Sequence, residues 1–239
     1  MKAVQAVKWG QTLNLIDEDE EPVRIEFLPG MTREEIDEFG KALPCTLPDD
    51  IVDLLEFCRG FTGTVELVDF TGCDMGFSLP DVFPHGLPIA ADGFGNFWVV
   101  DLLPDSETWG PIYYCSHDAP VILYQTDSVS HFLQALFKMF VPPHESPLDD
   151  VHEDRIADVW GTNPGVLSHG ECIKSEDADL KEFAKALGPS FQFVDLREPQ
   201  VGHGFSWGRY GPNTVNKRHG HLPIFAYQKK GVLARLFGR

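Results

Sequence analysis

The chain has 239 residues, and its hydrophobic (43%) and charged (23%) fractions are ordinary for a globular protein with a sizeable core. Its 37 acidic and 19 basic residues give a formal net charge of −18, which disfavours nucleic acid and an anionic membrane surface as partners. The five cysteines contain no C-x-x-C pair, so neither a disulfide framework nor a structural zinc site is expected. We therefore expect a protein of the reducing cytoplasm without a membrane span.

The first part of the chain has the pattern of two helices. Thr32 and Glu35 have capping-box spacing, which predicts a helix start, and the apolar stripe that follows runs to Leu43. A second helix is predicted to begin at Pro48, which suits the first helical position, and to stop at Gly60.

The pattern then changes to short runs of β-branched and aromatic residues separated by Gly, Pro and Asp. These runs predict strands at 64–70, 87–91, 96–102, 112–117 and 121–125. Because the links between them are short, the strands should pair antiparallel as a meander. A third helix is predicted over 128–140, where an apolar stripe ends before Pro142 and Pro143.

The remaining sequence predicts an appendage to this first unit. Residues 141–174 begin with a proline-rich, acidic stretch that is typical of a connector, a helix is predicted over 175–187, and a strand over 191–196. Segments 204–210 and 222–228 are interpreted as a further hairpin. We therefore predict a domain over residues 1–140, a connector over 141–174 and an extension over 175–239 that packs on the first domain. The fold class is α+β, with helices packed on a mainly antiparallel sheet and a C-terminal α+β extension.

Charge is distributed unevenly along the chain. Residues 1–150 carry 27 acidic and 7 basic residues, whereas residues 151–239 carry 10 and 12. From His203 onward there are seven basic residues and no acidic one. Either the protein has two functional surfaces, or its basic end docks on its own acidic part. The apolar load of the same stretch, with Phe205 and Trp207 among others, favours packing on the acidic body over a free nucleic-acid arm.

Four motifs follow one another between about Met31 and Phe140. They are LPDDIVDLL at 47–55, PIAADGFGNFWVVDL at 88–102, GPIYYCSHD at 110–118 and SHFL at 130–133. In this order and spacing they resemble the SMI1/KNR4 family of the SUKH superfamily. The resemblance implies helices against a mainly antiparallel sheet and a non-enzymatic binding role. Bacterial members of that family are mostly predicted immunity proteins against polymorphic toxins, and fungal members are regulatory interaction proteins.

Two segments invite a catalytic interpretation, and each has a plainer one. The glycines of 92–96 lack the third glycine and the following helix of a dinucleotide loop, and they are typical of a tight turn into a strand. Cys115 and His117 share a strand face but point in parallel, so they do not form a nucleophile and base even with Asp118 nearby. We therefore favour the interpretation of a buried cysteine and an edge histidine over that of a nucleophile.

Four histidines are the candidates for a metal site or a hydrolase: His169, His203, His219 and His221. His219 and His221 would lie on one strand face, but no Asp or Glu follows Glu198 in the sequence to orient them. We therefore predict no catalytic residue, no metal and no cofactor.

The candidate partner-binding residues combine acidic and aromatic groups on the predicted sheet and its turn. They are Asp92, Asn96, Trp98, Asp101, Tyr114 and His117. An outward Trp98 or Phe97 would serve as an anchor, whereas a sheet covered on both faces would bury both.

The acidic charge and the resemblance together favour a binding module that neutralises a basic bacterial toxin domain, of nuclease or deaminase type. A cytoplasmic regulatory or scaffold protein is the first alternative, and a metal-dependent hydrolase is the second. The identity of the partner and the oligomeric state stay open at this point.

Overall fold

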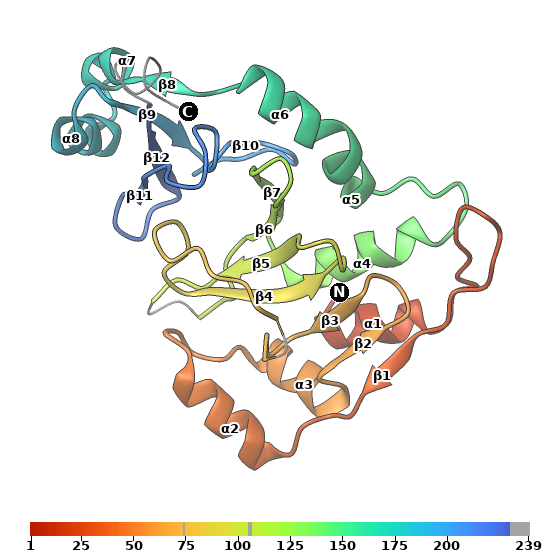
Figure 1. The fold of residues 1–239 in the computed structure, drawn as a ribbon. Coiled ribbons are helices and arrows are strands. Elements are labelled where there is room, and N and C mark those ends of the chain that lie inside the picture. Colours follow the sequence, from red (N-terminus) through yellow and green to blue (C-terminus); the bar gives the residue numbers. More distant parts are fainter. Residues whose placement is uncertain (74, 105–106, 230–239) are drawn as a thin grey trace.

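Two sheets organise the chain in the computed structural model, which describes residues 1–73, 75–104 and 107–229 (Figure 1). The larger sheet has eight strands in the order β1-β2-β3-β4-β5-β6-β7-β10, and the smaller has the order β11-β12-β9-β8. Neighbouring strands pair antiparallel in both sheets. Together with the helices described below, this confirms the predicted α+β class.

The large sheet contains the predicted meander. Its strands are β1 (Glu26–Leu28), β2 (Gly60–Thr62), β3 (Leu67–Asp69), β4 (Gly86–Ala91), β5 (Phe97–Asp101), β6 (Ile112–Cys115), β7 (Ile122–Thr126) and β10 (Gly204–Phe205). The prediction of β3 to β7 is confirmed, but the three-residue strands β1 and β2 were too short to give a strand signal. Gly60 does not stop a helix as predicted. It begins β2, where a Cβ would lie 1.9 Å from the Val68 carbonyl oxygen, so the strands can approach this closely only at glycine.

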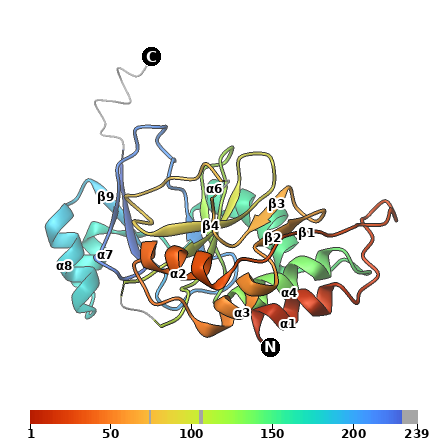
Figure 2. The ribbon, with the colours of Figure 1, turned by 90° about the horizontal axis from the view of Figure 1, so that it is seen from below.

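Helices cover one face of this sheet (Figure 2). They are α1 (Ala3–Gly10), α2 (Arg33–Ala42), α3 (Asp49–Phe57) and α4 (Val129–Met139). The predicted capping box at α2 is confirmed, because the Glu35 N–H donates to Thr32 Oγ1 and the Thr32 N–H donates to Glu35 Oε2. Leu54 of α3 and Phe132 of α4 are fully buried in the core between helices and sheet.

The C-terminal part of the chain adds the second sheet and several short helices. Its elements are α5 (Pro147–Asp149), the π-helix η1 (Asp150–Arg155), α6 (Ile156–Thr162), β8 (Leu167–Ser168), α7 (His169–Lys174), α8 (Ala178–Leu187), β9 (Phe191–Asp195), β11 (Asn216–Arg218) and β12 (Ile224–Gln228). Much of the predicted connector 141–174 is therefore helical. The predicted hairpin of 204–210 with 222–228 is wrong, because β10 pairs with β7 while β12 lies between β9 and β11.

The smaller sheet packs on the other face of the large one. Phe225 of β12 is fully buried, with its ring centroid 5.2 Å from that of Phe205 and 6.4 Å from that of Tyr113 in β6. This second core also holds Val99 and Ile122 of the large sheet. The large sheet is thus covered on both faces, by helices on one side and by the C-terminal elements on the other (Figure 1).

The described part of the basic end, residues 203–229, contributes to this packing, and residues 230–239 lie outside the described ranges. No helix in the described ranges has the length and apolar character that crossing a membrane requires.

Candidate protein-binding site

The turn between β4 and β5 is held by a single carboxylate. Asp92 Oδ1 accepts hydrogen bonds from the backbone N–H groups of Phe94, at 2.8 Å, and of Asn96, at 3.2 Å. Asp92 Oδ2 accepts a third from the Asn96 side-chain amide, at 2.6 Å. Gly93 and Gly95 adopt positive φ angles of 84° and 87°, a conformation that strongly favours glycine. The prediction of a tight turn is confirmed.

Two further segments fix this turn from the side. Asn96 Oδ1 accepts a hydrogen bond from the backbone N–H of His117, at 2.8 Å, which ties the turn to the loop after β6. His152 of η1 places its Nε2 atom 3.9 Å from Asp92 Oδ2. The turn is therefore a braced element of the surface.

Phe94 stands at the tip of this turn with 81% of its surface exposed, more than any other large hydrophobic side chain in the described ranges. Its backbone N–H is bonded to Asp92, so the backbone from which the ring projects is fixed, although the ring itself has little protein around it. An exposed aromatic ring on a braced turn is the arrangement that binding anchors require. The sequence carried one signal for it, an aromatic residue between two glycines.

The structure divides the six predicted contact residues into two groups. It brings together Asp92, Asn96 and His117, whereas Trp98, Asp101 and Tyr114 are only 2%, 1% and 0% exposed. These three side chains are therefore corrected to core residues, which cannot touch a partner in this structure. Binding through the other three stays a prediction.

The buried Trp98 and Asp101 side chains have hydrogen-bond partners inside the protein. The Trp98 indole N–H donates to Gln125 Oε1, and its ring centroid lies 5.0 Å from that of Tyr114. Both carboxylate oxygens of Asp101 accept hydrogen bonds from the guanidinium of Arg218, at 2.7 Å each. Burial raises the pKa of the Tyr114 hydroxyl, which is consistent with a neutral core side chain.

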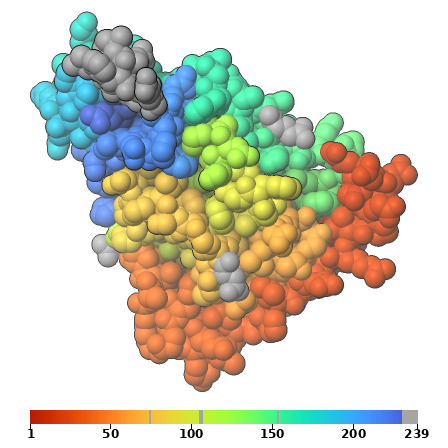
Figure 3. All heavy atoms as spheres, viewed as in Figure 1, coloured from red at the N-terminus to blue at the C-terminus, as the bar shows by residue number. Residues whose placement is uncertain are grey.

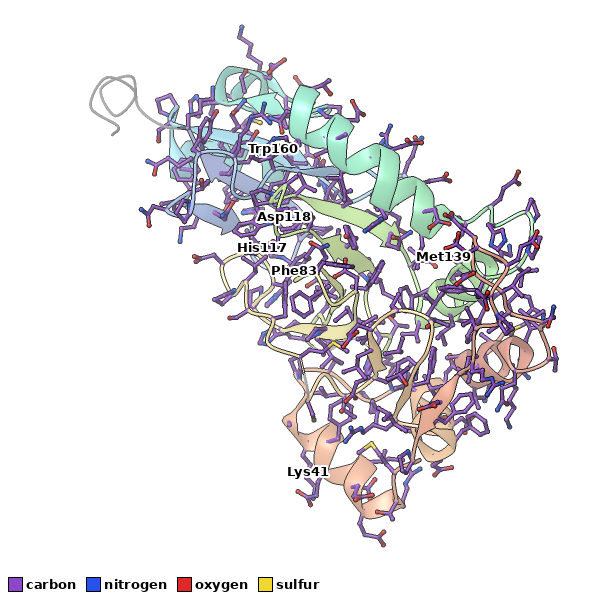
Figure 4. The ribbon with its side chains drawn as sticks, turned by 45° about the vertical axis from the view of Figure 1, so that its right-hand side comes forward. Lys41, Phe83, His117, Asp118, Met139 and Trp160 are labelled. Carbon is purple, nitrogen blue, oxygen red and sulfur yellow. The ribbon has the colours of Figure 1, made fainter. Side chains whose placement is uncertain are left out.

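Two exposed carboxylates lie beside the turn. The side chain of Asp118 is 95% exposed, beside a His117 side chain that is 72% exposed (Figure 4). Glu66 is also exposed and adjoins the turn, since a Cβ at Gly93 would lie 3.3 Å from the Glu66 Cβ. Between Arg59 and Lys138 the sequence has ten acidic residues and no Lys or Arg. Beside the exposed Phe94 ring, this surface thus presents the carboxylates of Glu66 and Asp118.

The structure gives little support to a cysteine nucleophile or to a histidine metal site. Cys115 is 4% exposed, and burial raises the pKa of its thiol, which disfavours the reactive thiolate. The His219 ring packs 4.9 Å from the Phe183 ring, centroid to centroid. In the ranges that the structure describes, no three His, Cys, Asp or Glu side chains come together in a way that could hold a metal ion.

The order of elements from α2 to α4, two helices, an antiparallel meander and a closing helix, agrees with the resemblance drawn from the sequence motifs. Residues 30–135 match the model of the SMI1 / KNR4 family (SUKH-1). The resemblance is thereby confirmed for this stretch, called the SUKH segment below, and the match is consistent with a protein-binding module. Comparisons with curated proteins and with solved structures gave no match.

The Phe94 turn and the loop at His117 both belong to the SUKH segment, whereas the smaller sheet lies outside it. Asp101 and Arg218 link the two parts, and their side chains are only 1% and 4% exposed. The candidate site itself lies on the SUKH segment, beside the loop whose Ser116 carbonyl accepts a hydrogen bond from Trp207 of the C-terminal part.

Proposed function

We propose that this protein is a non-enzymatic binding module of the bacterial cytoplasm, an immunity protein that neutralises a basic toxin domain of nuclease or deaminase type. The observation that carries the proposal is the exposed Phe94 on its braced turn, within a stretch that has no Lys or Arg. The match to the SMI1 / KNR4 family and the formal charge of −18 support it.

The two parts of the surface have separate roles in this proposal. Burying the Phe94 ring against a partner removes it from water, which is worth about 1.5–3 kcal/mol. Because the turn is already fixed by Asp92, little conformational entropy is lost on binding. The acidic surroundings attract a basic surface over a distance and raise the association rate. A nuclease presents such a surface, since it must bind phosphate groups.

The test is inhibition of the toxin domain encoded by the neighbouring gene. The purified chain is expected to bind that domain and abolish its activity, with an affinity that falls as salt concentration rises. Phe94→Ala should weaken binding about 30-fold, which corresponds to about 2 kcal/mol. Val201→Ala is the matched control, because Val201 is another exposed apolar side chain, 45% exposed, outside the site.

Two outcomes would contradict the proposal in different ways. Unchanged inhibition by a folded Phe94→Ala variant would show that the toxin contacts another surface. A chain that binds a cellular protein but neutralises no neighbouring toxin would favour the regulatory or scaffold role instead.

A further inference from the structure

A pocket of about 150 Å³ opens beside the Phe94 turn. Its apolar walls include four side chains from three separate segments of the sequence: Phe77, Leu79, Phe97 and Trp207. The remaining wall includes Gly76, Ser78, Gly95 and residues 115–117. A cavity of about this volume holds a benzene-sized group.

Trp207 is the part of the pocket that lies outside the SUKH segment. Its indole N–H donates to the backbone carbonyl of Ser116, at 3.4 Å, and the N–H of Gly208 donates to the Pro120 carbonyl, at 3.2 Å. Phe205, two residues earlier, is fully buried in β10. The indole is thus fixed against the loop that also carries His117. Figure 3 shows the yellow-to-lime surface of the SUKH segment bordering the blue C-terminal surface.

The walls favour a ring over a polar group. The ring centroids of Phe77 and Phe97 lie 5.5 Å apart, and both side chains are half-buried, as is Trp207. Aromatic walls attract an aromatic guest beyond the effect of area alone, through offset or edge contacts. The Ser116 carbonyl already accepts the Trp207 N–H, and burial keeps the Cys115 thiol from ionising by raising its pKa.

The charges near the pocket favour particular groups next to the aromatic ring of a ligand. Asp118 is exposed next to the lining residue His117, and no Lys or Arg occurs between Arg59 and Lys138. Arg209, which follows Trp207 closely, instead donates to the Trp160 carbonyl, at 2.8 Å. A ligand with basic groups beside its ring is therefore complementary to the rim.

We propose that this pocket receives an aromatic side chain from a basic segment of the protein partner, and that Trp207 extends the binding site beyond the SUKH segment. The proposal rests on the proposed function for the nature of the partner, but the pocket can be tested without a toxin.

The probes are three capped tripeptides, Arg-Phe-Arg, Arg-Ala-Arg and Glu-Phe-Glu, added to the full chain. Binding is followed by the NMR signal of the Trp207 indole N–H, assigned with a Trp207→Phe variant. Arg-Phe-Arg should shift this signal saturably, and each of the other two peptides should bind at least about tenfold more weakly.

The second part of the test uses a variant in which a larger side chain fills the pocket. A Cβ at Gly76 would have nothing within 4 Å, so Gly76→Leu can occupy the pocket without a backbone clash. It should weaken Arg-Phe-Arg binding by at least about tenfold. Gly161→Leu is the matched control, because a Cβ at Gly161 is equally unhindered and Gly161 lies on α6, outside the pocket lining. It should leave binding unchanged, and thermal unfolding verifies that both variants are folded.

Equal binding of the Phe and Ala peptides, or unchanged binding in Gly76→Leu, would overturn the proposal. If either result were obtained while the chain still neutralised the toxin, the pocket proposal would be rejected and the proposed function would be retained. Peptide binding without toxin neutralisation would support the pocket and reject the immunity role.

Discussion

At the scale of single residues, burial sets the reactivity of the cysteines. Four of them are at most 7% exposed, namely Cys45, Cys58, Cys115 and Cys172, whereas Cys73 is exposed. Burial raises the pKa of each buried thiol, that of Cys58 to about 12. The thiolate is the reactive form, so the buried thiols are both inaccessible and poorly ionised near neutral pH.

We expect iodoacetamide near neutral pH to label the native protein at Cys73 alone, and to label all five cysteines after denaturation. Intact mass and peptide mapping measure the number and the positions of the labels. A Cys73→Ser variant should take up no label in the native state. Native labelling of Cys115 would contradict the burial argument and revive its interpretation as a nucleophile.

At the scale of elements, glycine permits the close packing of α1 on α4. A Cβ at Gly10 would lie 2.4 Å from the ring of Phe137, which is fully buried and stacked on Phe61. Gly40 in α2 differs, because a Cβ there would meet only ordinary contacts, 3.7 Å from the Leu47 Cβ. Replacement by alanine should therefore change the free energy of unfolding in opposite directions at Gly10 and Gly40.

Gly10→Ala is expected to lower the free energy of unfolding by about 1–3 kcal/mol, since the added methyl overpacks the core. Gly40→Ala is expected to raise it by about 0.5–1 kcal/mol, through higher helix propensity and lower entropy of the unfolded chain. Urea denaturation measures both. A gain in stability at Gly10 would show that the helices have room to separate, and would contradict the close-packing argument.

At the scale of the whole molecule, one buried ion pair joins the two sheets. Besides its two bonds to Asp101, the Arg218 guanidinium donates to the carbonyls of Val82, His221 and Leu222. Burial raises the pKa of Asp101, and the bonds from Arg218 oppose that rise. The carboxylate thus depends on Arg218 to stay charged inside the protein.

We expect Arg218→Met to lower the free energy of unfolding by about 3–5 kcal/mol, because it leaves a buried charge without a partner. In that variant the pKa of Asp101 should rise further above its unfolded value. The folded state then takes up a proton, so the variant should regain stability as pH falls and lose it as pH rises through the raised pKa. Urea denaturation across the mildly acidic to neutral range measures this dependence.

Lys217→Met is the matched control, because the adjacent Lys217 makes only an exposed ion pair, 3.5 Å from Asp81. Its cost should be at most about 1 kcal/mol. The double variant Arg218→Met with Asp101→Leu should recover most of the lost stability. An Arg218→Met variant whose stability changes with pH no more than that of the parent would refute the argument.

The sequence by itself determined the local elements of the SUKH segment. The Thr32 and Glu35 cap, the helix after Pro48 and the stripe from Val129 are each carried by residues within a few positions of one another. The meander followed because strands that are consecutive in the sequence usually lie next to each other in a sheet. The turn at Asp92 was likewise predictable, since Asp, Gly and Asn have well-defined turn preferences.

Only the tertiary structure decided which of these residues reach the surface. The alternation of side chains along β5 predicts that Trp98 and Val99 point to opposite faces of the large sheet. It does not predict whether the face opposite the helices is covered. Phe205 and Phe225 cover it. The apolar residues of this C-terminal stretch predicted that it packs on the first domain, but no local pattern shows which face of the sheet it covers. Val99 and Asp101 are therefore buried by the C-terminal elements, whereas Trp98 is buried on the helix face against Phe132. The exposed aromatic residue is Phe94, whose exposure follows from the direction of a turn fixed by the packing around it.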